Sequence, residues 1–349
     1  MEKPIKVYRG EYLESTHNIH VAVVNVNGEL LYSYGDPNRF TFPRSSMKPF
    51  QAVAVVETGA AEAYDFEAKD LSLICASHNG EPFHRNRVAN ILERIQLNES
   101  ALQCGTHIPR DIDSYNEHIR NGGELTSVFS NCSGKHSGML TAVVHMNEEV
   151  NTYREISHPH QQRILDVIEY ICDFPKDKIK ISVDGCGVPV HQLPLKNTAV
   201  GFARLANPQS WESTDRARHL ERIRQAMTKH PEMVGGTNRF DTDLMKVFNG
   251  RLVAKAGAEG VQCIGDVETG LGIAIKVEDG NGRATSVASM EVLKQLGICD
   301  EKKYKELYQY ANAPVLNARK DRIGRIEAGF QLKEVSRASD IISSSEQRK

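Results

Sequence analysis

Three short segments contain side chains that could together hydrolyse an amide. Ser45 and Lys48 lie three residues apart where an apolar stretch begins, so a helix would place both side chains on one face. A serine hydroxyl becomes a nucleophile when a base takes its proton, and a lysine can be that base if burial or nearby cations lower its pKa. Ser77 and Lys255 supply a second hydroxyl and a second amine. The residue types predict serine-based catalysis.

The order of these segments strengthens the prediction. Read along the chain they are S-x-x-K at 45–48, S-x-N at 77–79 and K-x-G at 255–257. This set resembles the motifs of serine β-lactamases and penicillin-binding proteins. Position 256 is alanine, where those enzymes usually have threonine or serine. Taken alone, the first motif could equally be a helix-capping serine followed by a solvated lysine.

Two cysteines lie in glycine-rich surroundings that suggest a metal site. Cys132 begins CSGKHSG, and Cys186 lies in VDGCGVPV. Two thiolates with one or two nitrogen or oxygen ligands suit tetrahedral zinc. By spacing, His136 would be the obvious third ligand, whereas Lys135 could serve only as a neutral amine. The alternative is two buried thiols beside loops.

The hydrophobic pattern predicts how these segments are positioned. A hairpin is expected over residues 19–32, turning at Asn27-Gly28, and a second one involves residues 251–255 and 270–277. Helical spacing of apolar residues dominates between the hairpins and again after the second. The first expected helix starts near Ser45 or Ser46 and includes the apolar run 50–56. The other expected helices are 82–97, 136–146, 159–172, 215–229 and 284–296, and the expected short strands are 71–75 and 179–183.

This arrangement predicts an α+β fold in which both chain ends build one antiparallel sheet and the middle forms a helical insertion. We expect a single catalytic domain over residues 1–335, with a sheet part at about 1–80 and 250–335 and a mainly helical part at about 81–249. Residues 336–349 are rich in serine and charge and are expected to be a flexible tail.

Composition excludes several classes of protein. The chain has 349 residues, 43 basic and 45 acidic, with a formal net charge of −2, which argues against nucleic-acid binding. No apolar run approaches the roughly 18–20 residues of a membrane span, and the N-terminal residues lack the apolar core of a secretory signal. The seven cysteines, an odd number, fit a reducing compartment, so we expect a cytoplasmic protein.

Longer segments resemble a known family. FPRSSMKPFQA, CASHNGEPFH, NCSGKHSGML, VDGCGVPV and GTNRFDTDLM are similar to the bacterial L-asparaginases of the Rhizobium etli type, the asparaginase II family. The similarity extends from about residue 8 to residue 330. It implies the serine β-lactamase-like fold, hydrolysis of L-asparagine to L-aspartate and ammonia, and a homodimer.

The resemblance also implies roles for individual residues. Ser45 and Lys48 match the first Ser–Lys pair of the family, and Ser77 with Lys255 matches the second. The matching zinc ligands are Cys132, Lys135 and Cys186. Asp184 would lie beside the metal, near a bound water or the polar head of the substrate. Further expected substrate neighbours are Arg44, Asn79, Gly80 and His136.

Several alternatives stay open at this stage. Ser45 is the expected nucleophile with Lys48 as its base, but Ser77 could attack instead, with Lys255. Zinc would orient the substrate or hold the site together, and the alternative is a zinc hydrolase in which metal-bound water attacks. The substrate could be glutamine or another amide, because one methylene is weakly discriminated by a pocket. A non-catalytic ligand-binding homologue is the alternative outside enzymes.

Overall fold

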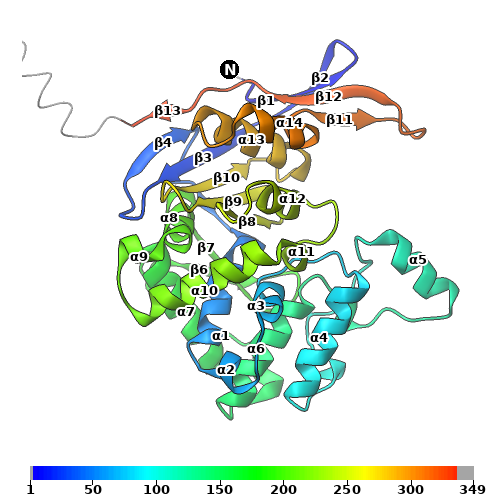
Figure 1. Ribbon diagram of the computed structural model, residues 1–349, viewed down its shortest axis with the longest axis vertical. Helices are drawn as coiled ribbons and strands as arrows, with labels where there is room; N and C mark the ends of the chain where they lie inside the picture. Colours follow the sequence, from blue (N-terminus) through cyan, green and yellow to red (C-terminus); the bar gives the residue numbers. More distant parts are fainter. Residues whose placement is uncertain (1–2, 336–349) are drawn as a thin grey trace, which may run out of the picture.

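Strands from both ends of the chain form the central sheet. The computed structural model describes residues 3–335, and its antiparallel six-stranded sheet lies above a layer of helices (Figure 1). The pairing of β3 with β10, with Val21 opposite Ile275, joins the N-terminal and C-terminal segments. In spatial order the strands are β13 (Lys333–Glu334), β4 (Leu30–Tyr34), β3 (Ile19–Val24), β10 (Gly272–Val277), β9 (Val261–Asp266) and β8 (Leu252–Gly257).

Helices cover this sheet closely, which explains its long apolar runs. Helix α8 (Leu195–Ala206) contacts β3, β9 and β10, and α13 (Thr285–Gln295) contacts β9 and β10. Strands buried by such covering helices read as continuous hydrophobic segments rather than as an alternation. Every residue of β9 is buried.

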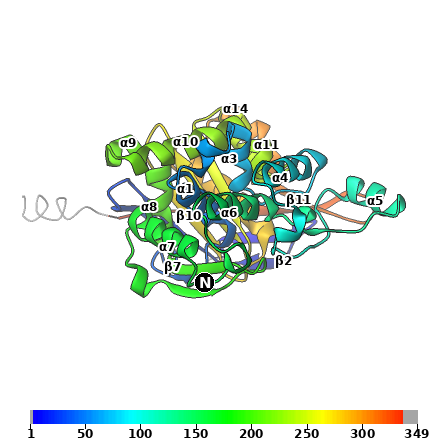
Figure 2. The same ribbon diagram turned by 90° about the horizontal axis from the view of Figure 1, so that it is seen from below.

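The middle of the chain forms the helical layer. Its α6 (Ser133–His145) packs against α1, α3 and α4 and lies in the midst of the helices when the molecule is seen from below (Figure 2). The other helices here are α1 (Lys48–Val56), α2 (Ala60–Ala63), α3 (Ala68–Ile74), α4 (Pro82–Arg94), α5 (Ile112–Arg120), α7 (Pro159–Cys172), α9 (Pro208–Trp211), α10 (Asp215–Lys229), α11 (Pro231–Val234) and α12 (Phe240–Val247).

Smaller elements complete the two parts. A four-stranded sheet contains β11 (Ala313–Leu316), β12 (Arg322–Ala328), β1 (Ile5–Arg9) and β2 (Tyr12–His17), and a three-stranded one contains β5 (Phe40–Thr41), β7 (Pro189–Pro194) and β6 (Lys180–Val183). Near the chain's C-terminal end are α14 (Glu301–Glu306) and α15 (Tyr308–Ala311). Short 3₁₀ turns are η1 (Arg44–Met47), η2 (Glu99–Ala101), η3 (Ser127–Phe129), η4 (Val150–Thr152), η5 (Lys176–Lys178) and η6 (Gly282–Ala284).

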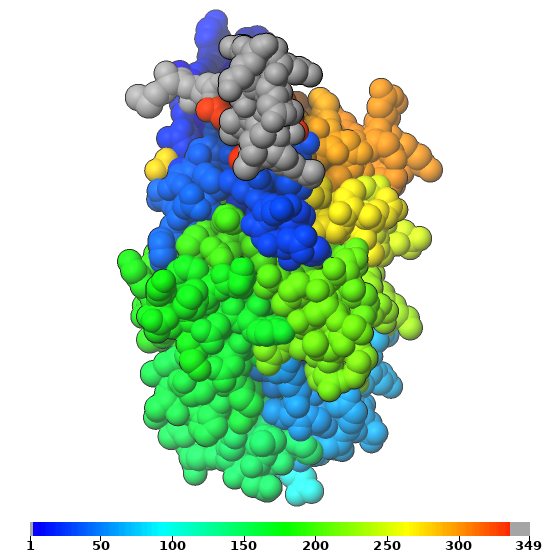
Figure 3. All heavy atoms as spheres, turned by 90° about the vertical axis from the view of Figure 1, so that its left-hand side faces the viewer, coloured from blue at the N-terminus to red at the C-terminus, as the bar shows by residue number. Residues whose placement is uncertain are grey.

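The predicted α+β architecture, with an antiparallel sheet from both chain ends, is confirmed. In Figure 3 the N-terminal and C-terminal segments gather at one end of the molecule and the middle of the chain at the other. The expected boundary near residue 80 needs correction. The N-terminal strands end at Thr41, and α1, α2 and α3 already belong to the helical layer. The predicted tail at 336–349 lies outside the described residues.

Two predictions about local structure were also incomplete or wrong. The expected strand at 71–75 is part of α3, because Glu67 and Asp70 form a capping box that starts a helix. A short apolar run has no periodicity that separates a strand from a buried helix. The second hairpin contains a strand that was not predicted, β9. Among residues 3–335, no helix is long and apolar enough to cross a bilayer.

Candidate active site

The junction between the last N-terminal strand and the first helix presents Ser45 and Lys48. Ser45 lies in η1, and Lys48 is the first residue of α1, where Pro49 occupies an early position that needs no N–H donor. Arg44, just before Ser45, has a left-handed φ of +55°. Such a conformation is costly for a residue with a side chain and persists only where the surrounding structure enforces it. Ser45 is half-buried, whereas Lys48 is buried.

Lys48 connects three separate segments. Its Nζ donates hydrogen bonds to the carbonyl oxygen of Ala76 at 2.5 Å, to Ser77 Oγ at 2.9 Å and to Cys132 Sγ at 3.3 Å. The contact with Ser77 has the length expected between a nucleophile or relay hydroxyl and its base. Among residues 3–335, no hydrogen bond joins Lys48 Nζ to the Ser45 hydroxyl. The amine of the first motif therefore meets the serine of the second.

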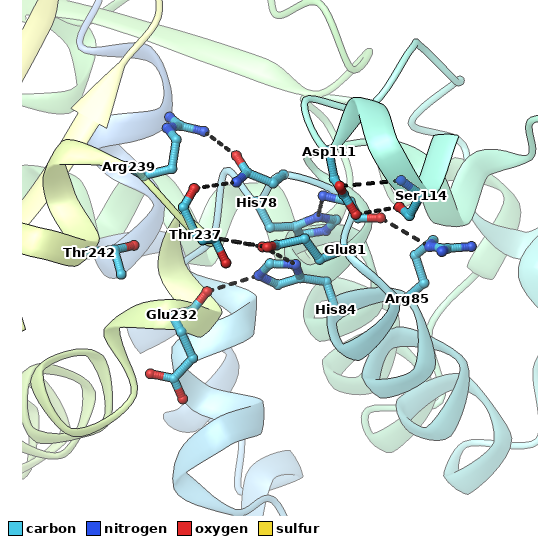
Figure 4. Close-up of polar contacts among 12 residues, drawn as sticks. His78, Glu81, His84, Arg85, Asp111, Ser114, Glu232, Thr237, Arg239 and Thr242 are labelled. Atoms are coloured by element: carbon cyan, nitrogen blue, oxygen red, sulfur yellow. Dashed lines mark hydrogen bonds and ion pairs between the residues drawn. The ribbon is translucent and has the colours of Figure 1, made fainter. Parts of the chain in front are cut away.

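The segment around Ser77 is held by its neighbours. The imidazole rings of His78 and His84 stack with their centroids 4.7 Å apart, and His84 Nε2 bonds the carbonyl oxygen of Glu232 at 2.9 Å. Glu81 Oε2 accepts a hydrogen bond from the Thr237 backbone N–H at 3.1 Å (Figure 4). Burial keeps the pKa of His78 well below its usual value, so this histidine is neutral.

Lys255 is a buried amine on β8, the edge strand of the large sheet. Its Nζ donates to the Ala256 carbonyl oxygen at 2.7 Å and lies 3.9 Å from Asp241 Oδ2. Burial lowers the pKa of Lys255 to about 7, although Asp241 raises it, and the charge of Lys48 lowers it further. Ser46 Oγ also donates to the Lys255 carbonyl oxygen, at 2.8 Å. This lysine can change charge near neutral pH.

A cavity of about 410 Å³ opens beside the two serines. Ser45 and Ser77 both line it, together with Arg239, Arg110 and the β8–β9 turn at 256–262. The volume is within the range of sites for small molecules. A substrate placed here would therefore meet both candidate nucleophiles.

The two cysteines predicted to bind metal come together beneath Lys48. Cys132 caps the start of α6, and Cys186 lies in the turn between β6 and β7. Lys135 Nζ donates to Cys186 Sγ at 3.0 Å. A hydrogen bond from Cys186 holds the pKa of Cys132 well below its usual value, and the charges of Lys48 and Lys135 lower it further, although burial opposes them. The pairing with Cys186 therefore favours the deprotonated form of Cys132.

The predicted substrate neighbours divide into two groups. Arg44 Nη2 forms an ion pair with Asp184 Oδ1 at 2.7 Å, close to Cys186, and His136 Nδ1 bonds the Tyr153 hydroxyl at 2.6 Å. Asn79 instead donates to the Thr237 carbonyl oxygen at 2.9 Å, and Gly80 adopts a φ of +79° in the same loop. Asn79 Oδ1 also accepts a hydrogen bond from Arg239 Nη1, at 3.0 Å.

The predicted zinc set matches the donor preferences of zinc in part. Thiolates and a nitrogen donor match the preferences of zinc, and the buried His136 Nε2 has no hydrogen-bond partner among residues 3–335. Lys135 would have to lose its proton, yet Cys186 and Cys132 raise its pKa against the effect of burial. Among the described residues, no group of three or more His, Cys, Asp or Glu side chains could hold a metal. The fit thus depends on Lys135.

Sequence reasoning missed two residues of this site. Asp241 and Arg239 lie in the GTNRFDTDLM segment, which served only to carry the family resemblance. Asp241 lies in the first turn of α12, and it accepts hydrogen bonds from Ala256 N and Gln262 Nε2, both at 2.8 Å. An acidic residue in the first turn of a helix does not by itself indicate these contacts. The partners of Asp241 lie on β8 and β9, which are separate elements further along the chain.

Comparison with solved structures gives only distant likeness. Chains titled "Crystal Structure Analysis of Mglu" and "Crystal structure of Mglu in its native form in the presence of 4.3M NaCl" are 13% and 15% identical, each with a TM-score of 0.46. These alignments cover 80% and 82% of this chain, but only 67% and 63% of those chains. A putative β-lactamase from Bacteroides dorei DSM 17855 is 11% identical, with a TM-score of 0.41, over 80% of this chain and 94% of that one.

Family comparison is more informative. No curated protein matches the sequence. The family profile described as L-asparaginase II matches residues 5–328, which include every candidate residue above. The chain therefore belongs to the L-asparaginase II family.

Proposed function

We propose that the protein hydrolyses the side-chain amide of L-asparagine to L-aspartate and ammonia. Family membership points to an amidohydrolase. The observation that carries the proposal is the 2.9 Å contact of Lys48 Nζ with Ser77 Oγ, beside a cavity that Ser45 also lines. A hydroxyl bonded to an amine at the wall of a cavity is the arrangement that serine acylation needs.

In the proposed reaction, Ser45 Oγ attacks the amide carbon of the substrate. Its proton passes through Ser77 Oγ to Lys48, which acts as the base in its neutral, deprotonated form. The tetrahedral intermediate then breaks its C–N bond, and Lys48 returns the proton to the departing ammonia. Water attacks the resulting ester by the same route and releases aspartate and Ser45. Both serines line the cavity, and Ser45 is the more exposed of the two, which favours it as the nucleophile.

The finer features of the proposal come from the family resemblance. We assign Cys132, Lys135 and Cys186 as residues that would hold zinc, with Asp184 nearby. A bound zinc would supply positive charge that fixes this corner of the site. We also propose a homodimer of the Rhizobium etli type in the cytoplasm, with no nucleic-acid or membrane partner.

The experiment is an ammonia assay of purified protein with L-asparagine and L-glutamine. We expect release from asparagine, loss of that release in Ser45→Ala, and no change in Ser210→Ala, a matched substitution of an exposed serine. Ammonia release from L-glutamine alone would show that glutamine, not asparagine, is the substrate. No release from either amide by folded, zinc-supplemented protein would refute the proposed function.

One observation favours a second assignment within the same chemistry. Ser77, not Ser45, is the serine directly bonded to Lys48. If Ser77 were the nucleophile, Ser77→Ala would abolish acylation while Ser45→Ala retained a measurable rate.

A further inference from the structure

Arg239, a basic side chain that lines the cavity, has N–H donors that make no hydrogen bond among residues 3–335. Arg239 Nη1 donates to Asn79 Oδ1 at 3.0 Å and to the Ser77 carbonyl oxygen at 3.4 Å. The guanidinium is therefore fixed against the segment that carries Ser77, at the edge of the network around Thr237 and Glu81 (Figure 4). Among residues 3–335, its Nε and Nη2 make no hydrogen bond.

The carboxylates near Arg239 already have partners. Asp241 accepts from Ala256 N and from Gln262 Nε2, and Glu81 accepts from Thr237 N. Neither forms an ion pair with Arg239 in the described part of the chain. Arginine has five N–H donors in a rigid fork that matches a carboxylate, so the free edge of Arg239 is suited to an anionic group from outside.

A second guanidinium makes the same wall more positive. Arg110 lines the cavity with Arg239, and it has no ion-pair partner among residues 3–335. Burial lowers the pKa of Arg239, and the charge of Arg110 lowers it further. The exposed carboxylate of Glu259, at the β8–β9 turn, is the acidic group lining this cavity. An anion between the two arginines would relieve their repulsion, and Glu259 supplies an opposite charge for an ammonium group.

We propose that Arg239, assisted by Arg110, binds the α-carboxylate of the substrate while its amide lies at the serines. The inference rests on the proposed amide hydrolysis and adds a substrate class: amides that carry a free carboxylate. It explains why two arginines line the cavity in addition to the residues needed for bond cleavage.

The test compares two substrates that differ only in the carboxylate. L-Asparagine and 3-aminopropanamide share the amide and the amine, but the second lacks the carboxylate. We would measure kcat/KM for both with wild type, Arg239→Gln, Arg239→Lys and Arg110→Gln. Arg319→Gln is the matched control, because that guanidinium is 88% exposed. Thermal unfolding of each variant checks the fold, and Arg239→Lys keeps the charge if Arg239→Gln does not fold.

We expect the ratio of kcat/KM for asparagine to that for 3-aminopropanamide to fall roughly 10- to 100-fold in Arg239→Gln, as for a lost charge-assisted hydrogen bond. In Arg239→Lys the ratio should fall by less, because lysine keeps the positive charge although it cannot bind the carboxylate bidentately. Arg319→Gln should keep the wild-type ratio. An equal loss on both substrates would show that Arg239 merely positions Ser77 and Asn79, and would overturn the inference, as would an unchanged ratio.

A binding measurement separates this inference from the proposed reaction. Calorimetric titration with L-aspartate reports carboxylate recognition without catalysis. If wild type cleaved neither amide, the proposed function would fail. Aspartate binding that is lost in Arg239→Gln, but kept in Arg319→Gln, would then still support the carboxylate site. Equal binding by both variants, or no binding by wild type, would overturn it.

Discussion

At the scale of single residues, Lys48 is the group on which the proposed chemistry depends most. It is 1% exposed and bonds three segments at once. Lys48→Met preserves length and removes the amine. We expect kcat for ammonia release to fall by about 100- to 10,000-fold, the usual contribution of general acid–base catalysis. The same change at the exposed Lys229 should be silent. Retention of more than a tenth of the activity in Lys48→Met would exclude it as the base.

The second lysine predicts a dependence on pH. Lys255 has a pKa of about 7, lowered by burial against the effect of Asp241. Lys255 loses its proton as the pH rises through this pKa, so its neutral form predominates above a pH of about 7. If turnover requires Lys255 as a neutral amine beside Lys48, kcat/KM rises with pH through this value. In Asp241→Asn the raising influence is lost, so the rising limb should move to lower pH. If the rising limb of the pH profile of Asp241→Asn stayed in place or moved to higher pH, a requirement for neutral Lys255 would be contradicted.

A site residue could be predicted from sequence when it belongs to a short motif, and could not when its role depends on contacts between distant segments. Ser45, Lys48, Ser77 and Lys255 could be chosen because each belongs to a short motif. The partner of Lys48 could not, because Ser77 approaches it from a loop 29 positions away. Arg239 was missed for the same reason. It was identified as a candidate because it lines the cavity, and the spacing of residues in the sequence does not show which residues line a cavity.

At the scale of elements, Gly272 allows α8 to lie close to the sheet. A Cβ at Gly272 would lie 2.0 Å from the Ala199 carbonyl oxygen and 2.4 Å from Ala203 N. Gly272→Ala must therefore push helix and strand apart, and we expect a loss of about 1–3 kcal/mol in the free energy of unfolding. Gly282→Ala is the control, because nothing lies within 4 Å of its added Cβ. Chemical denaturation measures both, and equal stability of the two variants would contradict this close packing.

Elements with strong periodicity were predictable and short apolar ones were not. The helices expected at 82–97, 159–172 and 215–229 are present as α4, α7 and α10. The prediction of a strand at 71–75 was wrong because a short buried helix and a short buried strand have the same apolar composition. β9 was missed because its neighbouring glycines obscure the strand pattern, although they serve the turns and close helix contact.

At the scale of the whole molecule, the site joins the two parts of the fold. Lys255 belongs to the sheet, whereas Lys48, Ser77 and Cys132 belong to the helical layer. This grouping could be anticipated in outline from strand signals at both chain ends. The position of the boundary could not, because α1 to α3 leave no linker that separates them from the strands.

Metal removal tests the proposed zinc site at this scale. Zinc held by Cys132 and Cys186 would tie the start of α6 to the β6–β7 turn. We expect bound zinc in purified wild type, its loss in Cys132→Ser, and a lower Tm after chelation, since a ligand that binds only the folded state stabilises it. Cys299→Ser, at a cysteine far along the chain, should retain the metal. Metal-free wild type with an unchanged Tm would refute zinc binding.

The central claim is that amide hydrolysis proceeds through an ester on Ser45. The most direct measurement is acid quenching of the enzyme during turnover of L-asparagine, followed by proteolysis and mass spectrometry of the peptides containing Ser45 and Ser77. We expect an aspartyl ester on Ser45 that is absent from Ser45→Ala. An ester on Ser77, or turnover without an ester on either serine, would contradict it.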